Sequence, residues 1–323
     1  MRLRTSLIGA ALGLSLVLTA CGGDDALEGG AEETASGEAT GDANGGGSLV
    51  VGGANFTEML IMEEIYSALL EDAGFTVEIR SVDAREIYAP ALVDGQIDVV
   101  PEYAATMAEY LNREANGPDA EPVASSDVDE TMEALRTLAE QAGLVALEPA
   151  QAVDQNAFAV TQEFADTNGL TTLSDLGALG QPVVLAATEE CPDRPFCQPG
   201  LEDVYGIQIA SLEPLGFGTL QVKQAVADGD ADLGLVASTD GTLEQFGLVV
   251  LEDDQGLQNA DNLVPVVNAE TAEDEAVVEA LNSLADALTT EDLATLNAQV
   301  DEERQQPADV ATAFLEEQGL IGG

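Results

Sequence analysis

The sequence predicts an α/β protein with two lobes, each built on a sheet covered by helices. Short apolar runs alternate with amphipathic segments between residues 48 and 161, which is the pattern of strands and crossover helices in a parallel sheet. A second series of the same kind extends from residue 183 to residue 251. About 275 residues follow position 47, enough for two sizeable hydrophobic cores.

The stretch from residue 49 to residue 74 predicts a strand, a tight turn and a helix. The apolar run 49–51 is followed by two glycines, which are expected to end the strand. Asn55 is followed three residues later by Glu58, as in a capping box, so we expect the helix to begin at Asn55. In an open α/β sheet such a turn lies at the carboxyl edge of the strands, where ligands bind.

The other elements follow from the same two periodicities. Strands are expected at 75–81, 97–100, 156–161, 183–186, 209–212, 232–236, 248–251 and 263–268. Helices are expected at 85–93, 104–112, 127–142, 199–204, 220–228, 274–288, 291–300 and 308–318. Pro101 is expected to stop the third strand, which places Tyr103 and Thr106 at the same sheet edge as Asn55.

The first twenty residues predict a secretory signal. They hold two arginines and an apolar run over 7–18 that is too short to span a bilayer. The tetrapeptide L-T-A-C resembles the bacterial lipobox, which implies cleavage before Cys21 and a lipid on its sulfur; the alternative is an ordinary secreted protein. Residues 21–47 are rich in Gly, Ala and acids without a basic residue, so we expect a disordered tether.

Composition excludes several classes of function. The chain has 9 basic and 61 acidic residues and a net charge of −52, so it repels nucleic acid and anionic headgroups and should meet a membrane only through a lipid anchor. It has no histidine, which removes Ser/His/Asp and Cys/His catalysis. Cys191 and Cys197 are too few for a zinc site, so we expect a disulfide between them, and neither a metal nor a cofactor.

Four motifs resemble the substrate-binding lipoproteins of osmoprotectant ABC importers, which take up glycine betaine, choline and related quaternary ammonium solutes. They are V-V-G-G-A-N-F-T-E, R-E-I-Y-A-P-A-L-V-D-G-Q-I-D-V-V-P-E-Y-A-A-T, N-A-F-A-V and D-G-D-A-D-L-G-L-V-A-S-T-D-G. The resemblance extends from about residue 48 to the C-terminus. It implies a type II periplasmic-binding fold, with two α/β lobes, 48–155 plus 262–323 and 156–261, joined by two crossover strands around the ligand.

The same resemblance implies a monomeric, extracytoplasmic binding protein, lipid-anchored to the outer face of the cell membrane, that delivers solute to an ABC permease by hinge closure. Alternatives are a protein that binds another small amine or an amino-acid-like solute, and a ligand sensor. An enzyme such as a deaminase or transferase on the same scaffold conflicts with the missing histidines and the lipid anchor.

A quaternary ammonium group donates no strong hydrogen bond, so proteins hold it with aromatic faces and diffuse negative charge. The expected aromatic residues are Tyr103 and Phe158, with Tyr88 and Phe56 as further candidates, and the alternative for each is packing in a core. The resemblance assigns Arg194 to the carboxylate of a betaine, with Glu190 beside it; the alternative is a surface ion pair. Other expected ligand-binding residues in these motifs are Asn55, Thr57, Thr106, Asn156, Thr239 and Asp240.

The chain departs from the family pattern at several positions of the expected site. Ala237 stands where relatives place an aromatic residue, Asp261 stands where some relatives place tyrosine, and Phe158 replaces the usual tyrosine. The lysine often found at position 54 is an alanine. These changes thin the aromatic cage and add negative charge, which favours a cation such as choline over glycine betaine.

Overall fold

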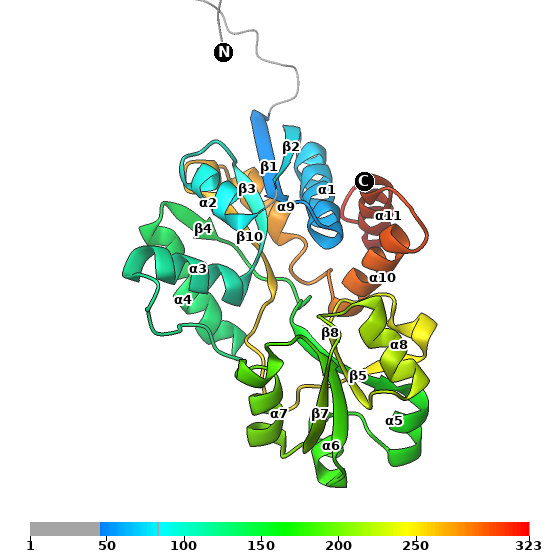
Figure 1. The fold of residues 1–323 in the computed structure, drawn as a ribbon. Helices are drawn as coiled ribbons and strands as arrows, with labels where there is room; N and C mark the ends of the chain where they lie inside the picture. The colour runs from blue at the N-terminus through cyan, green and yellow to red at the C-terminus, as the bar shows by residue number, and fades with distance from the viewer. Residues whose placement is uncertain (1–45, 83, 323) are drawn as a thin grey trace, which may run out of the picture. The chain divides into compact units, whose positions relative to one another are not determined.

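The computed structural model describes residues 46–82 and 84–322, which form two five-stranded sheets with helices packed on them (Figure 1). The α/β class predicted from the sequence is confirmed. We call each sheet with its helices a lobe. The signal peptide, Cys21 and the acidic tether expected from the sequence lie outside the described residues.

The first lobe has the strand order β2-β1-β3-β10-β4. Its strands are β1 (Ser48–Ala54), β2 (Thr76–Val82), β3 (Val99–Tyr103), β4 (Leu144–Ala146) and β10 (Leu263–Asn268). Strand β1 pairs in parallel with β2 and β3, whereas β10 runs antiparallel to β3 and β4. Since β10 comes from late in the chain, two separated segments of sequence build this sheet.

The second lobe has the strand order β7-β6-β8-β5-β9. Its strands are β5 (Asn156–Thr161), β6 (Val183–Ala187), β7 (Ile209–Pro214), β8 (Leu233–Ala237) and β9 (Leu248–Leu251). Strand β6 pairs in parallel with β7 and β8, and β5 runs antiparallel to β8 and β9. The predicted parallel sheets are therefore corrected to mixed ones, because β5 and β10, where the chain changes sheet, run against their neighbours.

Helices surround both sheets. They are α1 (Thr57–Asp72), α2 (Arg85–Val93), α3 (Ala104–Asn116), α4 (Val128–Gln141), α5 (Gln162–Asn168), α6 (Leu173–Leu179), α7 (Gln198–Tyr205), α8 (Leu220–Asp228), α9 (Glu275–Asn282), α10 (Thr290–Asp301) and α11 (Pro307–Gln318). In Figure 1, α10 and α11 lie beside α1, so the C-terminal helices complete the first lobe. No helix in the described ranges is long and apolar enough to cross a membrane.

Four predicted element boundaries were wrong. Strand β1 continues through both glycines to Ala54, and α1 begins at Thr57 with Phe56 as its N-cap and no capping side chain. Strand β3 continues through Pro101, which lies opposite Pro265 of β10, so neither strand offers a backbone donor there. Helix α9 ends at Asn282 and residues 283–287 form turns. Strand β4, α5 and α6 were not predicted.

The two glycines of β1 are needed for packing rather than for a turn. A Cβ at Gly52 would lie 2.6 Å from the Ile97 side chain, and one at Gly53 would lie 2.5 Å from Oε1 of Glu63. Glu63 is fully buried on α1 and accepts a hydrogen bond from Ser81. Gly53 thus lets α1 approach the sheet closely, and Gly52 makes room for the Ile97 side chain.

A buried ion pair anchors the first lobe below that turn. Glu102 on β3 is completely buried and accepts two hydrogen bonds from Arg85 on α2, at 2.9 and 2.8 Å. The Tyr88 hydroxyl donates to the same carboxylate at 2.7 Å. The pKa of Tyr88 is raised, first by burial and then by the Glu102 charge, so the phenol stays a donor.

Two connections join the lobes, residues 147–155 between β4 and β5 and residues 252–262 between β9 and β10. An isolated antiparallel bridge, Val153 with Asn262, holds these connections against each other. The residues next to this bridge, Asp154 and Asp261, are therefore placed between the two lobes.

Candidate functional site

Two adjacent cavities lie where the lobes and their connections meet, and we call them together the cleft. The larger has a volume of about 560 Å³ and is lined by the β1–α1 turn, α10 and the segments 217–218 and 239–242. The smaller has a volume of about 440 Å³ and is lined by α3, both connections and the loop before α7. Asp154 and Phe217 line both cavities, so these residues stand at their junction.

Three phenylalanines expose their side chains to the cleft. Phe56, Phe196 and Phe217 are 45 %, 41 % and 45 % exposed, although large aromatic side chains usually gain stability by burial. Phe56 comes from the first lobe and the other two come from the second. Aromatic rings on both walls are placed to enclose an apolar or cationic group.

Sequence reasoning found Phe56 but missed Phe196 and Phe217. Phe217 stands between Gly216 and Gly218, whose φ values of 95° and 56° are in the left-handed region that favours glycine. The G-F-G tripeptide therefore forms a tight loop with an aromatic residue at its tip, and that signal could have identified Phe217. No comparable local signal marks Phe196.

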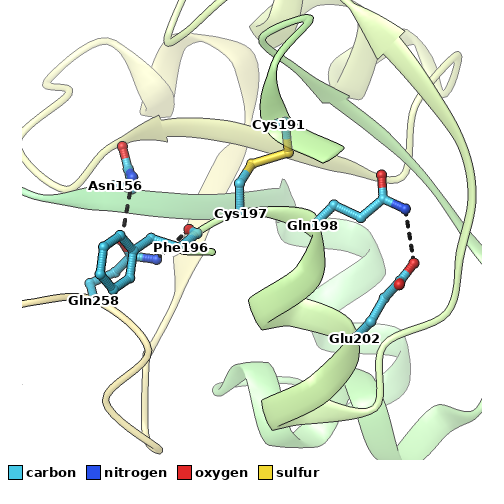
Figure 2. Close-up of a disulfide and its surroundings, with 7 residues drawn as sticks. All are labelled: Asn156, Cys191, Phe196, Cys197, Gln198, Glu202 and Gln258. Carbon is cyan, nitrogen blue, oxygen red and sulfur yellow. Dashed lines mark hydrogen bonds between the residues drawn. A yellow bond between two sulfur atoms is a disulfide. The ribbon is translucent and has the colours of Figure 1, made fainter. Parts of the chain in front are cut away.

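A disulfide between Cys191 and Cys197 holds the loop that presents Phe196 (Figure 2). Both cysteines are buried in the second lobe. The carbonyl oxygen of Phe196 accepts a hydrogen bond from Gln258 Nε2 at 2.8 Å, and Gln258 Oε1 accepts one from Asn156 at 3.3 Å. This chain of contacts ties the Phe196 loop to the connection 252–262 and to the first residue of β5.

The S-T-D-G motif brings the second lobe against the first. A Cβ at Gly241 would lie 2.1 Å from the carbonyl oxygen of Ala294 on α10, so only glycine fits there. Thr239 donates its hydroxyl to Asp154 at 3.1 Å, and its carbonyl oxygen accepts from Asn297 on α10 at 3.1 Å. Asp240 is paired with Lys223 at 2.8 Å. These contacts hold Thr239, Asp240 and Gly241 in place along the larger cavity.

Glu58, Asp154 and Asp261 lie close together in the cleft, and of these three carboxylates the sequence analysis selected only Asp261. Glu58 accepts hydrogen bonds from the Tyr103 hydroxyl at 2.6 Å and from Asn297 Nδ2 at 2.8 Å. Asp261 accepts from the backbone N–H of Thr106 at 2.8 Å and from its hydroxyl at 2.5 Å. Asp154, with the Thr239 bond described above, and Glu58 were missed, because many acids in this chain look alike by sequence.

Burial raises the pKa values of Asp154 and Asp261 in the cleft. Burial raises the pKa of Asp154 to about 7, and the neighbouring Glu58 carboxylate adds to the rise. Burial also raises the pKa of Asp261, against the hydrogen bonds from Thr106, which lower it. The pKa of Tyr103 lies well above its usual value because of burial and the Glu58 charge, so its hydroxyl remains a donor.

The structure brings seven of the thirteen expected ligand-binding residues to the cleft. Phe56, Thr57, Thr239 and Asp240 line the larger cavity, and Thr106, Asn156 and Asp261 line the smaller. Neither lining includes Asn55, Tyr88, Tyr103, Phe158, Glu190 or Arg194. Asn55 is exposed and its backbone N–H donates to Val82 at 2.8 Å.

Three of the four expected aromatic residues are buried in this structure. Phe158 is 1 % exposed and packs in the core of the second lobe, while Tyr88 is equally buried beside Glu102. Tyr103 is also buried and reaches the cleft only through the hydroxyl that holds Glu58. These rings pack in the lobes because β3, β5 and α2 turn them away from the cavities.

Glu190 and Arg194, expected beside a betaine carboxylate with a surface ion pair as the alternative, lie outside the linings of both cavities. Both residues are exposed, and within the described ranges no ion pair joins them. Arg113 on α3 lines the smaller cavity, and Lys223, already paired with Asp240, lines the larger. Among the described residues, no cluster of His, Cys, Asp and Glu is arranged to hold a metal ion.

A family model described as the substrate binding domain of ABC-type glycine betaine transport system matches residues 47–317. The chain is 28 % identical to a glycine-betaine-binding protein of Pseudomonas aeruginosa, over 85 % of this chain and 89 % of that protein. It is 27 % identical to the glycine betaine-binding protein YehZ of Escherichia coli, over 83 % and 90 % of the two chains. The structure of apo YehZ superimposes with a TM-score of 0.74 over 85 % of this chain and 99 % of that one.

Proposed function

Because the chain belongs to the family of substrate binding domains of ABC-type glycine betaine transport systems, we propose that its cleft binds a small quaternary ammonium solute. The protein is a solute-binding protein of ABC transporters and not an enzyme. The relatives named above bind glycine betaine, and a Listeria monocytogenes relative, 23 % identical, is a carnitine transport binding protein.

The observation that supports this proposal most is the combination of exposed aromatic rings and carboxylates around one cleft. Phe56, Phe196 and Phe217 offer ring faces, and each cation–π contact contributes about 0.5 to 2 kcal/mol. Glu58, Asp154 and Asp261 supply negative charge without a strong directional demand. A methylated ammonium matches both, because it is cationic, apolar at its surface and unable to donate a strong hydrogen bond.

We further propose that the solute closes the two lobes and that the closed form is what an ABC permease recognises outside the cytoplasm. Phe56 and Glu58 belong to the first lobe, whereas Phe196 and Phe217 belong to the second. A ligand that contacts both sets gains more in the closed form than in the open one and therefore shifts the population towards closure. The connections 147–155 and 252–262 are the hinge in this proposal.

The test is titration calorimetry with choline, glycine betaine, proline betaine and carnitine, with glycine as the control that lacks a quaternary group. The protein is refolded first to remove any ligand carried through purification. We expect at least one of the four to bind at micromolar to low millimolar concentration and glycine not to bind. Absence of binding by all four at millimolar concentration contradicts the proposal.

Lipid anchoring at Cys21 is a separate part of the proposal, supported by the L-T-A-C tetrapeptide. Replacing Cys21 with Ser is expected to abolish incorporation of labelled palmitate and to release the protein from the membrane, because serine offers no thiol for the diacylglycerol. Cys191→Ser is the matched control and should still be labelled. Equal labelling of Cys21→Ser and the unmodified chain contradicts the anchor.

A further inference from the structure

Three neighbouring carboxylates of the cleft, Glu58, Asp154 and Asp261, accept hydrogen bonds only from neutral donors among the described residues. Those donors are the Tyr103 hydroxyl, the Asn297 amide, the Thr239 hydroxyl, and the hydroxyl and backbone N–H of Thr106. Within the described ranges, the four ion pairs join other residues. The cluster therefore lacks a protein cation in direct contact.

Such a cluster cannot easily carry three full charges while the cleft is empty. Like charges repel at short range, and partial burial removes water that would screen them. Asp154 is the group most affected, since its pKa is raised to about 7 by burial and by Glu58. Protonation of Asp154 relieves the repulsion, and a bound cation would relieve it as well.

Asn297 adds an independent sign that the larger cavity is built for a ligand. The residue lines that cavity, is 9 % exposed, and its Oδ1 is buried without a hydrogen-bond partner, whereas its Nδ2 is fully used. Native structures rarely leave such an oxygen unpaired. The carboxylates beside it repel a ligand carboxylate.

We propose that Asp154 holds a proton in the empty cleft and releases it when a cation enters, so that the site selects quaternary ammonium solutes that carry no carboxylate. In this exchange the O–H bond of the acid breaks, the electron pair stays on the carboxylate oxygen, and the proton passes to solvent buffer. This inference rests on the proposed function and names its ligand class and regulation.

Other charged and titratable groups around Asp154 also influence its pKa. Those facing it directly are Glu58, Asp261 and the Tyr103 phenol. Arg85 and Glu102, which pair with each other, lie behind Asp261, while Glu109 and Arg113 line the smaller cavity and Lys223, Asp240 and Asp301 line the larger. Arg113 and Lys223 come from the two walls, and Lys223 is neutralised by Asp240.

The sign of the pH dependence follows from this arrangement. A bound cation lowers the pKa of Asp154 from its value of about 7 in the empty cleft. Below pH 7 the empty cleft therefore holds the proton and releases it on binding, whereas above about pH 8 Asp154 has already lost the proton before the cation binds. Affinity for choline should rise with pH by up to about tenfold per unit below pH 7, the limit for one proton released, and level off above pH 8.

The experiment is calorimetry with choline and glycine betaine at pH 6.5 and 8.5, in two buffers of different ionisation enthalpy. The buffer dependence of the heat counts the protons released. We expect about half a proton or more for choline at pH 6.5, close to none at pH 8.5, and choline affinity at least about tenfold above that of glycine betaine. Asp154→Asn should abolish the release at pH 6.5.

Two further variants keep the result interpretable. Glu58→Gln removes the neighbouring charge, so the pH at which Asp154 releases its proton should move downward, and this variant serves if Asp154→Asn does not fold. Glu64→Gln on α1 is the matched control, because burial also raises the pKa of Glu64 but the residue lies outside the cleft. It should leave the proton count unchanged.

The possible outcomes separate this inference from the proposed function. If choline and glycine betaine bind without proton exchange, or bind equally well, the proton-exchanging cation site is wrong while quaternary ammonium binding stands. If Asp154→Asn releases as many protons as the unmodified protein, the assignment to Asp154 is wrong. If no quaternary ammonium solute binds, the proposed function and this inference fall together.

Discussion

Replacing Arg85 with Met is expected to lower the free energy of unfolding by about 3 to 5 kcal/mol. The change removes both hydrogen bonds to Glu102, which is completely buried on β3 and would keep an uncompensated charge. Methionine matches the length of the arginine stem, so the loss of packing is small. Urea unfolding at pH 7, with both transitions fitted to a common slope, measures the difference.

Two controls test the cause of that loss. Arg80→Met removes an ion pair whose side chains are 43 % and 65 % exposed, so we expect a cost below about 1 kcal/mol. The double variant Arg85→Met/Glu102→Gln should recover part of the stability, since it removes the buried charge as well as its partner. Equal costs for Arg85→Met and Arg80→Met would contradict the importance of the buried pair.

The double variant Phe196→Ala/Phe217→Ala is expected to weaken binding of a quaternary ammonium solute by about 1 to 4 kcal/mol, which is roughly a fivefold to thousandfold loss of affinity. Two cation–π contacts at about 0.5 to 2 kcal/mol each give this range. Both side chains are exposed, so their removal should leave the stability of the second lobe nearly unchanged. Calorimetry gives the affinity, and thermal unfolding without ligand gives the stability.

A leucine pair, Phe196→Leu/Phe217→Leu, distinguishes cation–π binding from simple apolar contact. Leucine keeps most of the apolar surface but has no ring face, so we expect most of the affinity loss to remain. Val204→Ala is the control for an exposed apolar side chain outside the cleft and should bind normally. Normal binding by the leucine pair would contradict the cation–π interpretation. Normal binding by the alanine pair would show that neither Phe196 nor Phe217 contacts the solute.

The sequence by itself determined most of the elements. Helices α2 and α8 and strands β5, β9 and β10 have the predicted bounds, because the periods of 3.6 and 2 residues in apolar side chains depend on which face is buried. The boundaries it missed depend on distant residues. Strand β1 passes through two glycines, where Ile97 packs against Gly52 and α1 packs against Gly53, and β3 passes through Pro101 opposite another proline.

The sequence indicated where the cleft lies but not which aromatic side chains line it. Strand-end motifs correctly placed polar residues such as Thr106 and Thr239 at the cleft, since strand ends meet at one edge of a sheet. The sequence also selected Tyr103 and Phe158 as the aromatic contacts, and the structure buries both. The exposed rings belong instead to loops, at Phe196 and Phe217.

Only the tertiary structure decided which aromatic and acidic side chains face the cleft. Periodicity records that a residue is buried or exposed along its own element, and it carries no information about which distant segment lies opposite. Asp154 is one acid among many in the sequence, and its environment arises because the bridge between Val153 and Asn262 brings it near Glu58 and Asp261. Proximity between segments some hundred residues apart requires the packed fold.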